Sequence, residues 1–252
     1  MDDRSAARGA LPQALTHGLS ELIGTFVMMT VGITGIIVAF GTNQLVALLP
    51  HPGDRVWFCG FMFALVVAII IYSPIGRISG AHLNPAVTLT FFLERQLPGR
   101  DALVYIAMQV IGSTAAAALC LALWGERAVA AKIGATLPGS GYSTLDAFAV
   151  EVLATFILLR TICFFLHTPA LTRFTGLAVG LAIFLLVGTF GPISGASLNP
   201  ARSLGPVLVG APAASLWAYL SGPITATGLA VAAHHLIPLL KRPIFHRLNP
   251  QH

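Results

Sequence analysis

The sequence has very few charged residues. Only 9% of its 252 residues are Asp, Glu, Lys or Arg, whereas soluble domains carry about 25%. Hydrophobic residues make up 56% of the chain. So little charge leaves too little polar surface to cover a water-soluble body of this size. The composition therefore excludes a soluble globular protein and a disordered chain, and it predicts an integral membrane protein.

Cysteine is also scarce. The three cysteines, Cys59, Cys120 and Cys163, lie in apolar runs without a CxxC spacing, so we interpret them as small buried hydrophobic residues rather than disulfides or metal ligands. The chain has no HExxH motif, no GxSxG motif and no credible Ser/His/Asp set. We therefore expect no enzyme, no cofactor and no metal.

The net charge of +5 does not indicate a nucleic-acid-binding protein, because the basic residues are distributed as in a membrane protein. Nine of the fourteen fall in termini or connections on one predicted face: Arg4, Arg8, Arg77, Arg95, Arg100, Arg173, Lys241, Arg242 and Arg247. Basic loops favour the cytoplasmic side, so we expect both termini in the cytoplasm and a multi-pass protein of the plasma or inner membrane. Arg160 and Arg202 fall at membrane depth.

Six apolar runs have about the 20 residues that a membrane helix needs. They cover residues 14–40, 56–72, 102–124, 147–166, 174–190 and 214–240. The first run is too long for a signal-peptide core, so we interpret it as a retained span. Two further segments, 85–93 and 200–209, begin with Asn-Pro but are about half as long as a span. The prediction is an all-α membrane protein in which six transmembrane helices and two re-entrant half-helices form one domain over residues 1–252.

An internal repeat relates the two halves of the chain. Residues 78–86 read ISGAHLNPA and residues 193–201 read ISGASLNPA, which agree at eight of nine positions. Upstream, ELIGTF at 21–26 matches EVLATF at 151–156. Each repeat, about 14–124 and about 147–240, contains three spans, and an odd number inserts the two repeats in opposite orientations. The half-helices are therefore expected to enter from opposite faces and to meet near the midplane.

The two Asn-Pro pairs predict helix starts, since asparagine is a good N-cap and proline suits the first turn. Two ordinary helix starts would not explain a duplicated string in apolar surroundings. Lipid tolerates irregular backbone only where it is buried in protein or lines an aqueous cavity, which predicts a cavity along residues 79–83 and 194–198. Two helix N-termini and the amides of Asn84 and Asn199 would favour uncharged polar solutes over cations. Gly80 and Gly195 would permit the tight backbone.

These motifs resemble the aquaporin family, also called major intrinsic proteins, over essentially the whole chain. The family's two NPA boxes correspond to Asn84, Pro85, Ala86 and to Asn199, Pro200, Ala201. The resemblance implies an aquaporin-like right-handed bundle, a passive channel for water and small neutral solutes, and a homotetramer in the lipid bilayer. The string GPISGASLNPARSLGP is similar to the plant Nod26-like branch and its bacterial relatives. Tyr219-Leu220 indicates permeation of solutes larger than water, because strict water channels resemble Phe-Trp at these positions. Ser203 points the other way, because typical glycerol facilitators have aspartate there.

The resemblance also implies a selectivity constriction formed by Arg202, Ala196, Val187 and a fourth wall residue. Counting along the sequence leaves Phe63 and Ala64 as alternatives, and the family's usual aromatic residue favours Phe63. A constriction of Phe, Val, Ala and Arg is wider and more apolar than that of strict water channels. Solutes such as glycerol are therefore expected, while water, glycerol, urea and metalloid hydroxides stay open as the physiological solute.

The resemblance further implies that Glu21, Glu151 and His82 brace the re-entrant loops. Glu21 and Glu151 are acids at membrane depth, so an ion-coupled secondary transporter, in which they would bind protons or cations, is the alternative. Arg160 departs from the family pattern, and we interpret it as a side chain that extends toward the cytoplasmic face. Residues 125–146 are expected to form an extracellular connection without identifiable chemistry.

Overall fold

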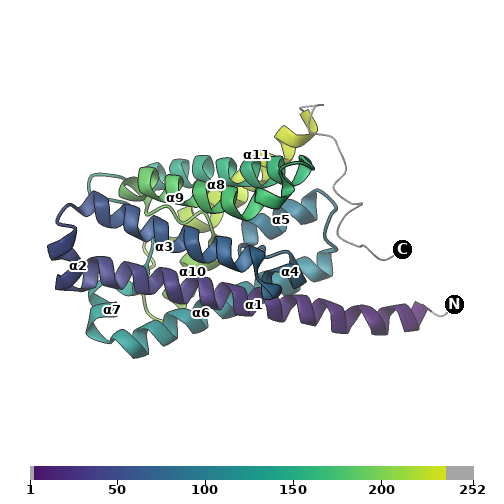
Figure 1. Cartoon of the computed structure of the whole chain (residues 1–252), viewed down its shortest axis with the longest axis horizontal. Coiled ribbons are helices and arrows are strands. Elements are labelled where there is room, and N and C mark those ends of the chain that lie inside the picture. The colour runs from purple at the N-terminus through teal and green to yellow at the C-terminus, as the bar shows by residue number, and fades with distance from the viewer. Residues whose placement is uncertain (1–2, 237–252) are drawn as a thin grey trace.

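The structure is a computed structural model that describes residues 3–236 (Figure 1). Six stretches within them are long and apolar enough to cross a membrane: Gln13–Gly41, Pro52–Tyr72, Gly99–Trp124, Thr144–His167, Thr172–Ser194 and Leu216–Leu236. The predicted number of spans is confirmed, and most bounds shift by a few residues. Residues 237–240 of the predicted last span lie outside the described residues, as do Lys241, Arg242 and Arg247.

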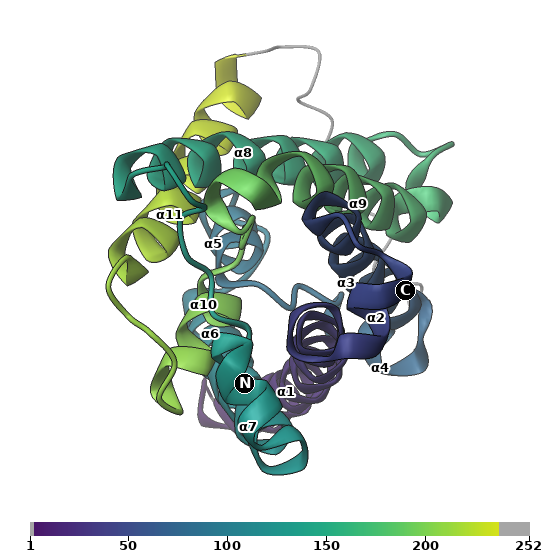
Figure 2. The same ribbon diagram turned by 90° about the vertical axis from the view of Figure 1, so that its left-hand side faces the viewer.

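The long helices come in corresponding sets. The first half supplies α1 (Asp3–Gly41), α3 (Pro52–Tyr72) and α6 (Gly99–Trp124), and the second supplies α8 (Thr144–His167), α9 (Thr175–Ser194) and α11 (Leu216–Leu236). Helix α1 packs on α6, α8 packs on α11, and α3 of the first half packs on α9 of the second. The long helices are arranged in a ring when the molecule is viewed along its long axis (Figure 2).

Short helices complete the architecture. The half-helices are α5 (Pro85–Leu93) and α10 (Pro200–Leu208), close to the predicted 85–93 and 200–209. The connections contain α2 (Asn43–Leu48), α4 (Pro74–Ser79), α7 (Glu126–Ala130), η1 (Lys132–Gly134) and η2 (Thr172–Phe174). Ser79 and Ser194, which we expected in irregular backbone, are instead the last residues of α4 and α9.

Glycine brings packed helices close together at two corresponding places in the bundle. A Cβ atom on Gly112 of α6 would lie 2.5 Å from the carbonyl oxygen of Leu22, and one on Gly222 of α11 would lie 2.8 Å from Cβ of Glu151. Both contacts are too short for any larger residue. They seat α6 against α1 beside Glu21 and α11 against α8 beside Glu151, which are corresponding places in the two halves.

Candidate pore

A cavity of about 910 Å³ runs between the helices and is lined by residues of both halves. Its wall includes Val56 near one end of α3 and Tyr72 at the other. Sixteen helical steps of 1.5 Å separate these residues, so the cavity is about 24 Å long. That length approaches the roughly 30 Å of a bilayer's hydrocarbon core.

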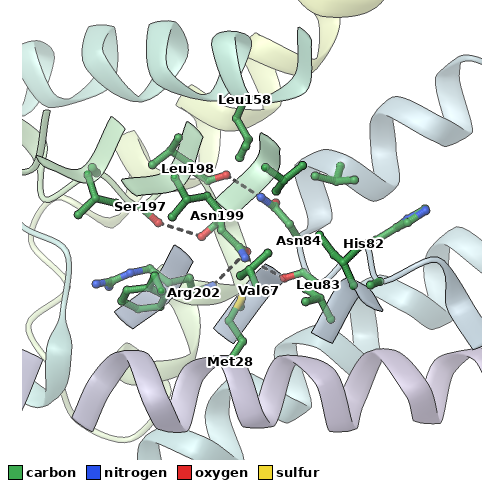
Figure 3. Close-up of a pocket in the computed structure, with 18 of the residues that line it drawn as sticks. Met28, Val67, His82, Leu83, Asn84, Leu158, Ser197, Leu198, Asn199 and Arg202 are labelled. Atoms are coloured by element: carbon green, nitrogen blue, oxygen red, sulfur yellow. Dashed lines mark hydrogen bonds between the residues drawn. The ribbon is translucent and has the colours of Figure 1, made fainter. Parts of the chain in front are cut away.

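Asn84 and Asn199 meet in the middle of this cavity (Figure 3). Each caps its own half-helix, because Oδ1 of Asn84 accepts from Ala86 N at 2.8 Å and Oδ1 of Asn199 accepts from Ala201 N at 3.0 Å. The Nδ2 atoms reach across: Asn84 donates to the Leu198 carbonyl and Asn199 donates to the Leu83 carbonyl, both at 2.8 Å. Each Nδ2 group retains a second N–H. The two half-helices therefore face each other with their N-termini, as the repeat predicted.

The loops before the two asparagines share one backbone conformation. Gly80 and Gly195 end the preceding helices with φ of 88° and 82°. Four non-glycine residues that follow also have positive φ: Ala81, Leu83, Ala196 and Leu198. Such conformations cost about 1–3 kcal/mol each and persist only where the surroundings hold them.

Two buried glutamates hold these loops. Glu21, which is 0% exposed, accepts from the backbone N–H of His82 at 2.9 Å and of Leu83 at 2.6 Å. Ser79 Oγ and Gln109 Nε2 also donate to it, at 2.6 and 2.7 Å.

Glu151 makes the corresponding contacts in the second half. It is also 0% exposed and accepts from Ser197 N at 2.8 Å, Leu198 N at 2.7 Å and Ser194 Oγ at 2.9 Å. Charge-assisted hydrogen bonds to a carboxylate are about twice as strong as neutral ones. The contacts of Glu21 and Glu151 are those that a bracing role requires.

The four predicted constriction residues come together from four segments. Phe63, Val187, Ala196 and Arg202 all line the cavity. Arg202 is 6% exposed, its Cζ lies 5.5 Å from the centre of the Phe63 ring, and its Nη1 donates to the Gly134 carbonyl at 2.7 Å. A cationic guanidinium and an aromatic face thus stand together in the wall.

The geometry favours Phe63 over Ala64 as the fourth wall residue. The Phe63 ring faces Arg202 and occupies the space beside Gly32, where a Cβ would lie 2.1 Å from the ring. The Ala64 backbone instead packs against Gly180 of α9, whose Cβ would lie 3.0 Å from the Ala64 carbonyl oxygen.

Two substitutions test whether Phe63 or Ala64 is the fourth wall residue. We expect Phe63→Trp to lower glycerol permeability by about tenfold or more and water permeability less, because extra bulk in a packed wall costs about 1–3 kcal/mol. Ala64→Trp should crowd the α3–α9 contact, lowering thermal stability while leaving the glycerol-to-water ratio of each folded channel unchanged. Vesicle light scattering measures both ratios. The reverse ranking would place Ala64 in the wall.

The connection 125–146 contributes to the site, so the expectation that it carries no chemistry was wrong. Gly134 supplies the carbonyl that receives Arg202, and Ala130, Ala131, Lys132 and Ala135 line the cavity. No sequence signal marks such a role, because every residue type except proline offers the same backbone groups.

His82 and Arg160 also have defined surroundings. His82 stacks on Phe91 with 4.6 Å between ring centres, and its Nδ1 lies 3.2 Å from Thr88 Oγ1. It also lines the cavity. Arg160 is half-buried between α8 and α11, with Nη1 donating to the Ala230 carbonyl at 3.4 Å. It is not among the residues of the cavity wall.

Comparisons with known proteins agree on one family. The family model described as "Major intrinsic protein" matches residues 10–234. The chain is 34% identical over 227 residues to "Aquaporin NIP1-1" of Oryza sativa subsp. japonica, which covers 90% of this chain and 75% of that protein. It is 36% identical over 228 residues to "Probable aquaporin AqpM" of Archaeoglobus fulgidus, covering 85% of this chain and 91% of that one.

A solved structure shows the same fold. The X-ray structure of the aquaglyceroporin from Plasmodium falciparum is similar to this chain with a TM-score of 0.75 and 22% sequence identity. The match covers 90% of this chain and 98% of that one.

Proposed function

Because the chain belongs to the major intrinsic protein family, whose members are membrane channels and not enzymes, we propose that it conducts water and small uncharged solutes passively and excludes protons and ions. The observation that carries this proposal is the meeting of Asn84 and Asn199 in one cavity that is lined by both halves of the chain. We further propose a homotetramer in the plasma or inner membrane with both termini in the cytoplasm.

The braced loops supply a line of hydrogen-bond acceptors. In a trans peptide group the C=O points opposite to the N–H. The N–H groups of His82 and Leu83 point at Glu21, so the carbonyls of the same peptide groups, those of Ala81 and His82, point away from the acid and toward the cavity that these residues line. The Glu151 contacts orient the second loop in the same way. A solute that can donate hydrogen bonds replaces its hydration along this path.

The centre of the pore repels positive charge. Each half-helix N-terminus carries about half a positive charge, and two of them converge where the Asn84 and Asn199 amides donate. Arg202 adds a full charge at the constriction. The oxygen of a water molecule at the centre accepts hydrogen bonds from these amide N–H groups. A hydronium or metal cation is repelled by the two helix N-termini at the centre and by Arg202 at the constriction, with little water to screen the repulsion.

The ion-coupled transporter is disfavoured by the position of the acids. Among the described residues that line the cavity there is no Asp or Glu, while four are cationic: Arg77, Lys132, Arg173 and Arg202. Glu21 and Glu151 are fully buried behind the loops with their oxygens occupied. A coupling site needs an acid that the pathway can reach.

The side chains of the predicted constriction favour the passage of solutes larger than water. Its predicted side chains are Phe63, Val187, Ala196 and Arg202, and only the arginine is polar. A wall with one fixed donor and three apolar groups suits a molecule with both a hydroxyl edge and a hydrocarbon edge, such as glycerol. We propose small polyols and other neutral hydroxylated solutes as the class.

Stopped-flow light scattering on vesicles with the purified protein tests the function. We expect protein-dependent water efflux under an impermeant osmolyte, and re-swelling under glycerol that needs no proton or sodium gradient. Empty vesicles provide the baseline. Flux that depends on such a gradient, or vesicles no more permeable than the baseline, would contradict a passive channel.

A further inference from the structure

We propose that a chain of three hydroxyl groups, Thr136, Ser203 and Ser197, positions Arg202 by fixing residues 132–136, and thereby sets the largest solute that passes. This inference rests on the proposed channel function and assigns these hydroxyls as positioning residues for its selectivity. Thr136 belongs to the connection 125–146, for which the sequence predicted no chemistry.

The hydroxyl chain is continuous and buried. Thr136 Oγ1 lies 2.7 Å from Ser203 Oγ, which lies 2.5 Å from Ser197 Oγ. Ser197 Oγ donates to the Asn199 carbonyl at 2.9 Å. The three side chains are at most 8% exposed.

The direction of the chain follows from the single proton of each hydroxyl. Ser197 gives its proton to Asn199, so it accepts from Ser203. Ser203 has then used its own proton and accepts from Thr136. The three hydroxyl groups therefore connect the second NPA box to the segment between α7 and α8, and each hydroxyl proton is donated to a hydrogen bond.

The segment next to Thr136 has backbone conformations that cost free energy. Lys132, Ile133 and Gly134 have φ of 52°, 53° and 70° in succession. A β-branched residue such as Ile133 is a strong outlier there, and strain of this kind is kept only by surrounding contacts. Burial of Ile133 and two local backbone hydrogen bonds, from Gly134 N to the Ala131 carbonyl and from Ala135 N to the Lys132 carbonyl, restrain this stretch from within. The Thr136 hydroxyl and the Gly134 carbonyl that accepts from Arg202 tie it to the second half of the chain.

Arg202 depends on this stretch for its place. Among the described residues, its guanidinium has one hydrogen bond shorter than 3 Å, the one to Gly134 O. Gly134 is two residues from Thr136, and Ala135 between them lines the cavity. Losing the Thr136 bond would let the stretch relax its strain, move the Gly134 carbonyl and release the guanidinium from the constriction.

Thr136→Val tests the proposal, because valine keeps the shape of threonine and removes the hydroxyl. We expect the erythritol-to-water permeability ratio in vesicles to rise about fivefold, the factor that one lost hydrogen bond typically represents. Thr136→Ser keeps the hydroxyl and should retain the wild-type ratio. Ser203→Ala removes the middle of the chain and should act in the same direction as Thr136→Val.

Thr144→Val is the matched control. Thr144 Oγ1 lies 3.0 Å from Ser215 Oγ, a similar Thr–Ser pair outside the cavity wall, and its loss should leave the ratio unchanged. A wild-type ratio in both Thr136→Val and Ser203→Ala, each measured on monodisperse protein, would overturn the positioning role, as would an equal effect of Thr144→Val. Wild-type protein without water permeability would instead remove the proposed function itself.

Discussion

Arg202→Val is expected to open the pore to larger polyols and to let cations leak. Arg202 is the one charged residue of the predicted constriction and is 6% exposed, so salt screens it little. At about 5 Å and an effective dielectric constant near 20, its repulsion of a passing cation amounts to roughly 3 kcal/mol, about a hundredfold in rate. Valine removes both this barrier and the bulk of the guanidinium.

Two measurements separate these effects: swelling of vesicles in glycerol and erythritol, and current across planar bilayers. Arg160→Val is the matched control, because it removes the same charge at membrane depth from a residue outside the cavity wall. Selectivity should be unaffected in that variant. An Arg202→Val protein that folds and keeps wild-type selectivity in both assays would mean that Arg202 is not part of the filter.

Glu151→Ala is expected to abolish both stability and permeability. Three donors, Ser197 N, Leu198 N and Ser194 Oγ, would lose their acceptor in a buried place. Each unsatisfied group costs about 1–3 kcal/mol, so the loss is roughly 3–9 kcal/mol, which is comparable with the whole stability of many proteins. The strained loop before Asn199 would also lose the contacts that hold it.

Thermal unfolding in detergent and water permeability per folded protein measure the two consequences. Glu21→Ala should behave similarly, since Glu21 makes the corresponding contacts in the first half. Glu126→Ala removes an exposed acid from α7 and should change neither property. Full permeability of a folded Glu151→Ala protein would argue against bracing and would reopen a role for this acid in transport.

The centre of the fold was predictable because its signals lie in side chains with fixed local consequences. Asparagine favours the N-cap and proline the first turn of a helix, so α5 and α10 could be placed from the sequence within one residue. Repetition of that string, together with an odd number of spans per repeat, predicted that the two N-termini would meet. The long helices followed from apolar length alone.

The wall of the pore was less predictable, because it depends on how distant segments pack. Counting residues could not choose between Phe63 and Ala64, whereas the space beside Gly32 and the Phe63–Arg202 contact favour one of them. The role of Gly134 had no signal, since it is performed by a carbonyl. Arg160 needed its neighbour Ala230 on α11, which lies 70 positions away along the chain.

The crossed asparagine bonds impose an order on how the protein is made. Asn84 finds its acceptor 114 positions further along the chain, and Leu83 finds its donor 116 positions further along. When only the first repeat has been synthesised, Glu21 can already hold the first loop, but Asn84 Nδ2 and the Leu83 carbonyl still lack their final partners. The crossed hydrogen bonds can form only after the second repeat has been synthesised, and contacts between residues so far apart in the sequence form slowly. Until then these two groups need water or other temporary partners, because an unpaired backbone or amide group inside the bilayer is costly.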